Sequence, residues 1–184
     1  AGYLAKRMKD HGEDSRYAAA RERWGKKADL YLLGFFIFQA VAAVVLAIPF
    51  LVIAYMDEGP SLVTGALAIV VWLISVIGEG TADAQLKAFK AKPENKGKVC
   101  RQGLWYYSRH PNYFGELLFW LSLWLFALSA DPGSWWTGIG FVAMAAMFVF
   151  ASIPLMDERS RARRPGFAAY AERTSSLVPW PPRS

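Results

Sequence analysis

Long stretches without Asp, Glu, Lys or Arg constrain this chain most. Three of them cover residues 30–56, 59–78 and 132–156, and a shorter one covers 117–130. A helix needs roughly 20 mostly apolar residues to cross about 30 Å of hydrocarbon. The three long stretches meet this requirement, and the fourth meets it when Glu116 is included. We therefore predict an all-α, polytopic membrane bundle with four transmembrane spans.

The remaining composition excludes other classes of protein. Of the 184 residues, 54% are hydrophobic and 20% are charged, and the net charge is +6. A soluble domain spreads its charged residues so that every amphipathic helix has a solvent-exposed polar face. In this chain the charged residues are absent from the four apolar runs. This excludes a soluble enzyme, a disordered protein and an ordinary nucleic-acid binder. The predicted partners are the lipid bilayer and a lipophilic small molecule, without nucleic acid, and the oligomeric state is left open.

The basic residues predict the topology. Residues 1–29, 79–113 and 157–184 hold eight, seven and six of the 21 Lys and Arg, and the other two connections contain only acidic charge. Positively charged loops stay in the cytoplasm during insertion. We therefore predict that both termini of this chain are cytoplasmic and that the membrane is a bacterial inner membrane.

One membrane domain is expected over 1–184. It consists of a cytoplasmic helical segment over 1–29, a four-span bundle over 30–156, and a cytoplasmic C-terminal helix and tail over 157–184. Because the sequence starts at Ala1 with a charged, helix-prone stretch, we expect further N-terminal spans to precede it in the natural protein.

The candidate chemistry gathers in the run LWYYSRHPNYFGE, which ends at Glu116 where the third span begins. Proline suits the first position of a helix, so Pro111 predicts a helix that His110 caps. A helix N-terminus next to an arginine favours anions, which makes Arg109 a candidate ligand-binding residue. Asn112, Tyr113 and Glu116 share one face with Arg109.

Glu116 is the sharpest of these candidates. A carboxylate about one turn inside a span is costly, faces the bundle interior as a rule and marks function. The alternative is that Glu116 lies at headgroup depth and is hydrated. Arg109 and His110 also have simpler interpretations, as a membrane-surface anchor and a capping residue.

A second polar cluster follows the fourth span. Glu158 and nearby arginines, including Arg159 and Arg163, are predicted to fold over the same pocket and to hold a phosphorylated cofactor by bidentate contacts. The alternative is a basic tail that touches anionic lipid. Glu79 and Asp83, at the inner end of the second span, are predicted to form a solvated face.

The sequence lacks the usual nucleotide and metal signatures. It has no GxGxxG after a strand, no GxxxxGK[ST], no metal-spaced Cys/His set and no Ser-His-Asp candidate. Any nucleotide must therefore be bound by the membrane scaffold, and no metal site is predicted.

The strings GLWYYSRHPNYFGE, over 103–116, and GFAAYAERTSSLVPWPP, over 166–182, resemble bacterial membrane proteins that share the C-terminal domain of steroid 5α-reductases. They are more distantly similar to sterol reductases and to isoprenylcysteine carboxyl methyltransferases. The resemblance implies a cytoplasm-facing cavity in which reductases bind NADPH and methyltransferases bind S-adenosylmethionine.

The resemblance adds roles to these residues. It implies that Asn112 and Glu116 line the nicotinamide end of the cofactor and that the C-terminal helix supplies further contacts. With Arg163 added from the second polar cluster, the predicted cofactor-binding set is Arg109, His110, Asn112, Tyr113, Glu116, Glu158, Arg159, Arg163, Tyr170 and Arg16. The acid and the tyrosine that polarise the substrate in steroid reductases lie on N-terminal helices largely missing from this chain. Tyr3 is the remnant that would join Glu116 in catalysis.

Three functions are compatible with these residues. The first is an NADPH-dependent reductase that transfers a hydride to a lipophilic enone, steroid-like or isoprenoid. The second is a membrane methyltransferase that uses S-adenosylmethionine on the same scaffold. The third is a non-catalytic membrane assembly or lipid-binding protein.

Overall fold

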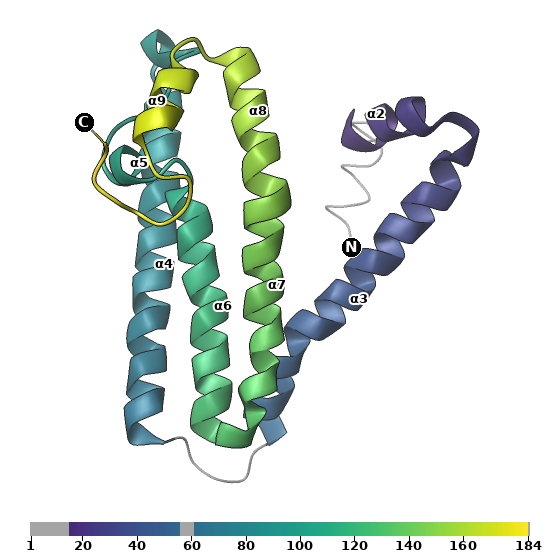
Figure 1. Ribbon diagram of the computed structural model, residues 1–184, viewed down its shortest axis with the longest axis vertical. Coiled ribbons are helices and arrows are strands. Elements are labelled where there is room, and N and C mark those ends of the chain that lie inside the picture. The colour runs from purple at the N-terminus through teal and green to yellow at the C-terminus, as the bar shows by residue number, and fades with distance from the viewer. Residues whose placement is uncertain (1–14, 56–60, 184) are drawn as a thin grey trace. The chain divides into compact units, whose positions relative to one another are not determined.

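A computed structural model describes residues 15–55 and 61–183 (Figure 1), so Tyr3 lies outside the described residues. Four helical stretches are long and apolar enough to cross a membrane: Arg21–Tyr55, Leu62–Lys90, Pro111–Ala130 and Pro132–Arg163. The described residues form helices and connections, with a single isolated bridge between Ser108 and Ser175. The prediction of an all-α chain with four candidate spans is confirmed.

The chain divides into two compact units, Ala1–Val45 and Leu46–Ser184, which we describe separately. The first contains α2 (Ser15–Trp24), the short 3-10 helix η1 (Gly25–Lys27) and the start of α3 (Ala28–Tyr55). Arg21 and Asp29 form an ion pair in this unit. Large apolar side chains along α3, such as Phe38 at 70% exposure, face outward, as expected of a helix solvated by lipid.

In the second unit, α4 (Leu62–Lys90) packs along α6 (Pro111–Ala130) through small residues. The buried residues of α4 are Gly65, Ala68, Ser75 and Ala82. The Ser75 hydroxyl donates a 2.8 Å hydrogen bond to the carbonyl of Gly115 on α6. Small residues let two membrane helices approach closely and bond directly, so this seam fixes the position of the α6 N-terminus.

The third helical stretch of this unit is one long, irregular helix. It begins with the 3-10 helix η3 (Pro132–Gly138), continues as α7 (Ile139–Met147), passes through a π-helical turn η4 (Phe148–Ser152) and ends as α8 (Ile153–Arg163). Met144, Phe148 and Ile153 from this stretch form the buried apolar cluster with Leu177. Tyr113 and Phe114 of α6 pack against that cluster.

Non-membrane segments cover one end of these helices (Figure 1). They are the loop with the 3-10 helix η2 (Pro93–Asn95), the short α5 (Leu104–Tyr107), α9 (Phe167–Arg173) and the tail beyond it. Trp105 joins α5 to the end of α4, because its indole N–H donates to the carbonyl of Ala82 at 2.8 Å. Gly166, with φ 84°, makes the left-handed turn between α8 and α9, a conformation that favours glycine.

Candidate functional site

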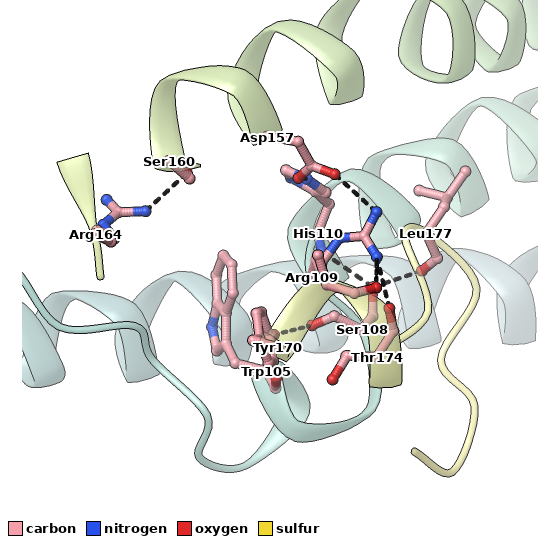
Figure 2. Close-up of polar contacts among 11 residues, drawn as sticks. Trp105, Ser108, Arg109, His110, Asp157, Ser160, Arg164, Tyr170, Thr174 and Leu177 are labelled. Carbon is pink, nitrogen blue, oxygen red and sulfur yellow. Dashed lines mark hydrogen bonds and ion pairs between the residues drawn. The ribbon is translucent and has the colours of Figure 1, made fainter. Parts of the chain in front are cut away.

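A buried carboxylate joins the RHPN run to α8. Asp157 is 6% exposed, and its two oxygens are 2.7 Å from Arg109 Nη2 and 3.0 Å from His110 Nε2 (Figure 2). Both basic side chains are themselves largely buried. A buried carboxylate needs such partners, because an unpaired charge in the interior is very costly. Asp157 therefore fixes where Arg109 and His110 lie.

Arg109 also holds the C-terminal tail. Its Nη1 donates to the carbonyls of Ala171 and Thr174 at 2.8 and 2.7 Å, and its backbone N–H donates to the carbonyl of Ser175 at 2.8 Å. The Ser108 hydroxyl donates to the carbonyl of Leu177 at 2.8 Å. The two terminal nitrogens of the guanidinium, Nη1 and Nη2, are thus committed to protein partners, whereas the buried Nε has no partner among the described residues. The contacts of Nη1 and Nη2 make Arg109 a positioning residue in this arrangement.

His110 occupies the N-cap position of α6, with Pro111 as the first helical residue. The prediction that His110 caps a helix beginning at Pro111 is confirmed for its position, and the His110 side chain contacts Asp157 instead of making a cap hydrogen bond. The ring stacks on Tyr113, whose ring in turn stacks on Phe148, with centroid distances of 5.1 and 4.8 Å. Asp157 contacts the His110 ring and Phe148 contacts the Tyr113 ring. Both belong to the long helix that ends as α8, so this one helix positions both rings.

Asn112 carries an acceptor without a partner. Its Nδ2 donates to Asp83 Oδ1 at 3.2 Å, but its Oδ1 is buried and accepts no hydrogen bond from the described residues. Of the two residues predicted to form a solvated face, Asp83 is exposed and orients the Asn112 amide, whereas Glu79 is half-buried against Gly115 of α6. A buried acceptor without a donor is unfavourable by about 1–3 kcal/mol, and a ligand with an N–H group would satisfy it.

Arg109, His110, Asn112 and Tyr113 line a cavity of about 740 Å³ at the covered end of the helices. Its walls come from the end of α4, the loop that follows it, the start of α6, and α8. No carboxylate lines it among the residues that the structure describes. Eight basic side chains do: Lys90, Lys92, Lys96, Lys98, Arg109, Arg159, Arg163 and Arg164. With the charge of Arg109 balanced by Asp157, the others give the cavity a strongly positive potential.

Most of the predicted cofactor-binding residues meet at this cavity. Those that line it are Arg109, His110, Asn112, Tyr113, Arg159, Arg163 and Tyr170. Glu116 and Glu158 do not line it, since α6 contributes only Asn112 and Tyr113, and Glu158 is exposed on α8. Arg16 lies in α2, where its side chain is outside the described part of the chain. Sequence reasoning missed the convergence of the four lysines.

Tyr170 forms a wall of the cavity and keeps its proton. Its hydroxyl contacts the carbonyl oxygens of Trp105 and Ser108, the latter at 3.1 Å. Burial, reinforced by the nearby Cys100 thiol, raises the pKa of Tyr170 well above its ordinary value. The hydroxyl therefore acts as a permanent donor that fixes α9 to the backbone before α6.

Replacing Tyr170 by Phe tests that anchoring. We expect Tyr170→Phe to lower the free energy of unfolding by about 1–3 kcal/mol, because it leaves buried carbonyl oxygens without a donor. Thermal unfolding in detergent would measure the loss. An unfolding free energy of Tyr170→Phe equal to that of the unaltered protein would contradict the assignment.

A family described as "Protein of unknown function (DUF1295)" matches residues 1–174. The chain belongs to this family. The match spans both units and includes every residue that lines the 740 Å³ cavity. It ends before Ser175 and Leu177, the tail residues that Arg109 and Ser108 contact. It assigns no activity, so the relation to steroid 5α-reductases stays a prediction.

A curated relative is the "Probable O-methyltransferase ustE" of Ustilaginoidea virens, which is 29% identical over 123 residues. The aligned region is 66% of this chain but only 39% of that protein. The chain therefore spans about two-fifths of the relative's length. None of the solved structures gives a significant match.

Proposed function

We propose that this protein is an integral membrane reductase that uses NADPH to reduce a lipophilic enone. The observation that carries the proposal is the charge of the cavity, which has eight basic side chains and no carboxylate in its described lining. NADPH carries a diphosphate and a further phosphate. Guanidinium groups bind phosphoryl oxygens in bidentate fashion, and lysines act on them as point charges.

The residues present fit such a cofactor at both ends. The buried, unpartnered Oδ1 of Asn112 would accept a hydrogen bond from a carboxamide N–H, as the nicotinamide has. Arg159 and Arg163 on α8, and Lys96 and Lys98 on the facing loop, would hold the phosphates. Among the described residues, none of these four cations has an ion-pair partner.

When bound, NADPH supplies a hydride to the β-carbon of the enone, and a proton added at the α-carbon completes the reduction. The chain's own residues bind and orient: Asp157 holds His110 and Arg109, and the stacked Tyr113 fixes the cavity wall. Tyr3 remains our candidate for polarising the substrate carbonyl, and Glu116, one turn beyond Asn112 on α6, remains our candidate for orienting the nicotinamide carboxamide. Four apolar helices would let a lipophilic substrate enter from the bilayer.

Cofactor binding tests this proposal directly. We expect the purified protein to bind NADPH by calorimetry, and we expect Arg159→Ala and Arg163→Ala each to weaken binding by about tenfold or more, because each removes a charge-assisted hydrogen bond of about 1.5–3 kcal/mol. Added salt should weaken binding further. Arg161→Ala is the matched control, since Arg161 is exposed on the same helix and lies outside the cavity lining.

Failure of the folded protein to bind NADPH would refute the reductase. Equal affinities of Arg161→Ala and Arg163→Ala would instead refute the assignment of the phosphates to α8. The substrate class needs a separate assay, in which consumption of NADPH depends on an added enone in lipid nanodiscs.

The relative from Ustilaginoidea virens favours a second candidate, a methyltransferase that uses S-adenosylmethionine. We rank it lower because that cofactor has one carboxylate beside a positive sulfonium and a positive ammonium group. The cations of the cavity would repel most of its charge. Competition decides between the two: displacement of bound NADPH only by other phosphorylated nucleotides favours the reductase, and displacement by micromolar S-adenosylmethionine favours the methyltransferase.

A further inference from the structure

A second hollow lies beside α9. It has a volume of about 400 Å³ and is lined by Arg101, Tyr106, Ala169, Tyr170, Arg173, Thr174, Pro182 and Arg183. Three of these are arginines, and none of the described lining residues is acidic. The arginines come from the loop before α5, from α9 and from the tail, so the fold brings together residues that are far apart in sequence.

Protein contacts fix the walls of this hollow. Arg101 Nη2 donates to the carbonyl of Gly166 at 2.8 Å, and its guanidinium carbon lies 5.5 Å from the centre of the Tyr170 ring. The backbone N–H of Arg183 donates to the carbonyl of Arg173 at 2.9 Å, which holds the tail against α9. Hydrogen bonds therefore hold the loop before α5, the start of α9 and the tail together around the hollow.

The side chains of Arg173 and Arg183 have no hydrogen-bond or ion-pair partner in the part of the chain that is described. Arg101, Arg173 and Arg183 are exposed, and their charges give the hollow a positive potential that favours an anion. Guanidinium is planar and presents paired N–H donors that match phosphoryl oxygens. Arg101, in particular, keeps donors that the Gly166 carbonyl does not use.

We propose that Arg101, Arg173 and Arg183 form a second anion site that binds a phosphoryl group. It is separate from the cofactor cavity, with Tyr170 lining both. None of its three arginines lines that cavity, so the proposal does not rest on the reductase assignment. The phosphoryl group belongs either to a phospholipid headgroup or to a soluble phosphate compound. Tyr106, which lines the site, is 50% exposed, and tyrosine side chains favour a membrane interface.

Binding to two probes distinguishes these sources. The variants are Arg173→Ala and Arg183→Ala, because these side chains hold no other part of the fold and the proteins should stay folded. One probe is inorganic pyrophosphate, measured by calorimetry in detergent. The other is short-chain phosphatidic acid, measured by native mass spectrometry against phosphatidylcholine. Arg161→Ala is again the control, since it removes a cation that lines neither site.

We expect each variant to weaken binding of at least one probe about tenfold relative to Arg161→Ala. Loss of pyrophosphate affinity identifies a soluble ligand, and loss restricted to phosphatidic acid identifies a lipid headgroup. Pyrophosphate bound in the cavity is recognised by its sensitivity to Arg159→Ala. Unchanged affinity of both variants for both probes overturns the second site, whether or not NADPH binds in the cavity.

Discussion

We expect Asp157→Ala to be the most damaging single substitution outside the apolar core. It would leave Arg109 and His110 without the carboxylate that both contact, in a place where the side chains of Arg109 and Asp157 are only 12% and 9% exposed. Removing one partner of a buried pair is destabilising by about 3–5 kcal/mol, because the remaining charge stays buried without compensation. We expect a loss of this size in the free energy of unfolding, measured by thermal or denaturant unfolding in detergent.

The effect should extend to ligand binding. Released from Asp157, Arg109 would no longer be fixed against the carbonyls of Ala171 and Thr174, and the wall of the cavity formed by His110 would move. Asp157→Asn keeps the shape of the side chain and can still accept a hydrogen bond, so it separates the two effects. We expect it to fold more stably than Asp157→Ala and to bind NADPH less tightly than the unaltered protein.

Glu158→Gln provides the matched control, because Glu158 is the adjacent residue on the same helix and is exposed. It removes the same charge from the chain without opening a buried ion pair. We expect its unfolding temperature to stay near that of the unaltered protein. If Asp157→Asn and Glu158→Gln behaved alike in both measurements, the buried triad would not have the role assigned to it here.

The contrast between Asp157 and Glu158 also shows why part of the site escaped prediction. Both residues follow the fourth apolar run, and the sequence gives no reason to prefer one of them. Neighbours on a helix point about 100° apart, so the choice depends on the helical register at that point. The π-helical turn at Phe148–Ser152 changes this register, and its presence is not evident from a charge-free sequence.

The membrane helices and the start of α6 were predictable for local reasons. Runs without charge identify spans from length alone, and Pro111 identifies a first helical position from its fixed φ and missing N–H. The contacts of Asp157 with Arg109 and His110 instead join residues 48 and 47 positions apart. The lysines after α4 likewise reach the arginines of α8 only through the tertiary fold. Contacts between residues so far apart in the chain leave no pattern in the local sequence.

At the seam between α4 and α6, we expect Gly115→Ala to force the two helices apart. A Cβ atom at Gly115 would lie 2.8 Å from the Glu79 Cβ atom and 2.9 Å from the Glu79 backbone nitrogen. Backbone cannot move aside as a flexible side chain can, so the clash must shift one helix and disturb the 2.8 Å bond from Ser75 to the Gly115 carbonyl. Overpacking of this kind is destabilising by about 1–3 kcal/mol.

Two other glycines on α4 provide controls of the opposite sign. A Cβ atom at Gly78 or Gly80 would meet nothing within 4 Å, and replacing glycine by alanine inside a helix favours the helix by about 1 kcal/mol. We therefore expect Gly78→Ala and Gly80→Ala to keep or raise the unfolding temperature, while Gly115→Ala lowers it. Because Asn112 lies one turn before Gly115 and contacts Asp83 across the same seam, Gly115→Ala should also weaken NADPH binding. A Gly115→Ala protein as stable as the two controls would show that the helices are not in the close contact on which the position of Asn112 depends.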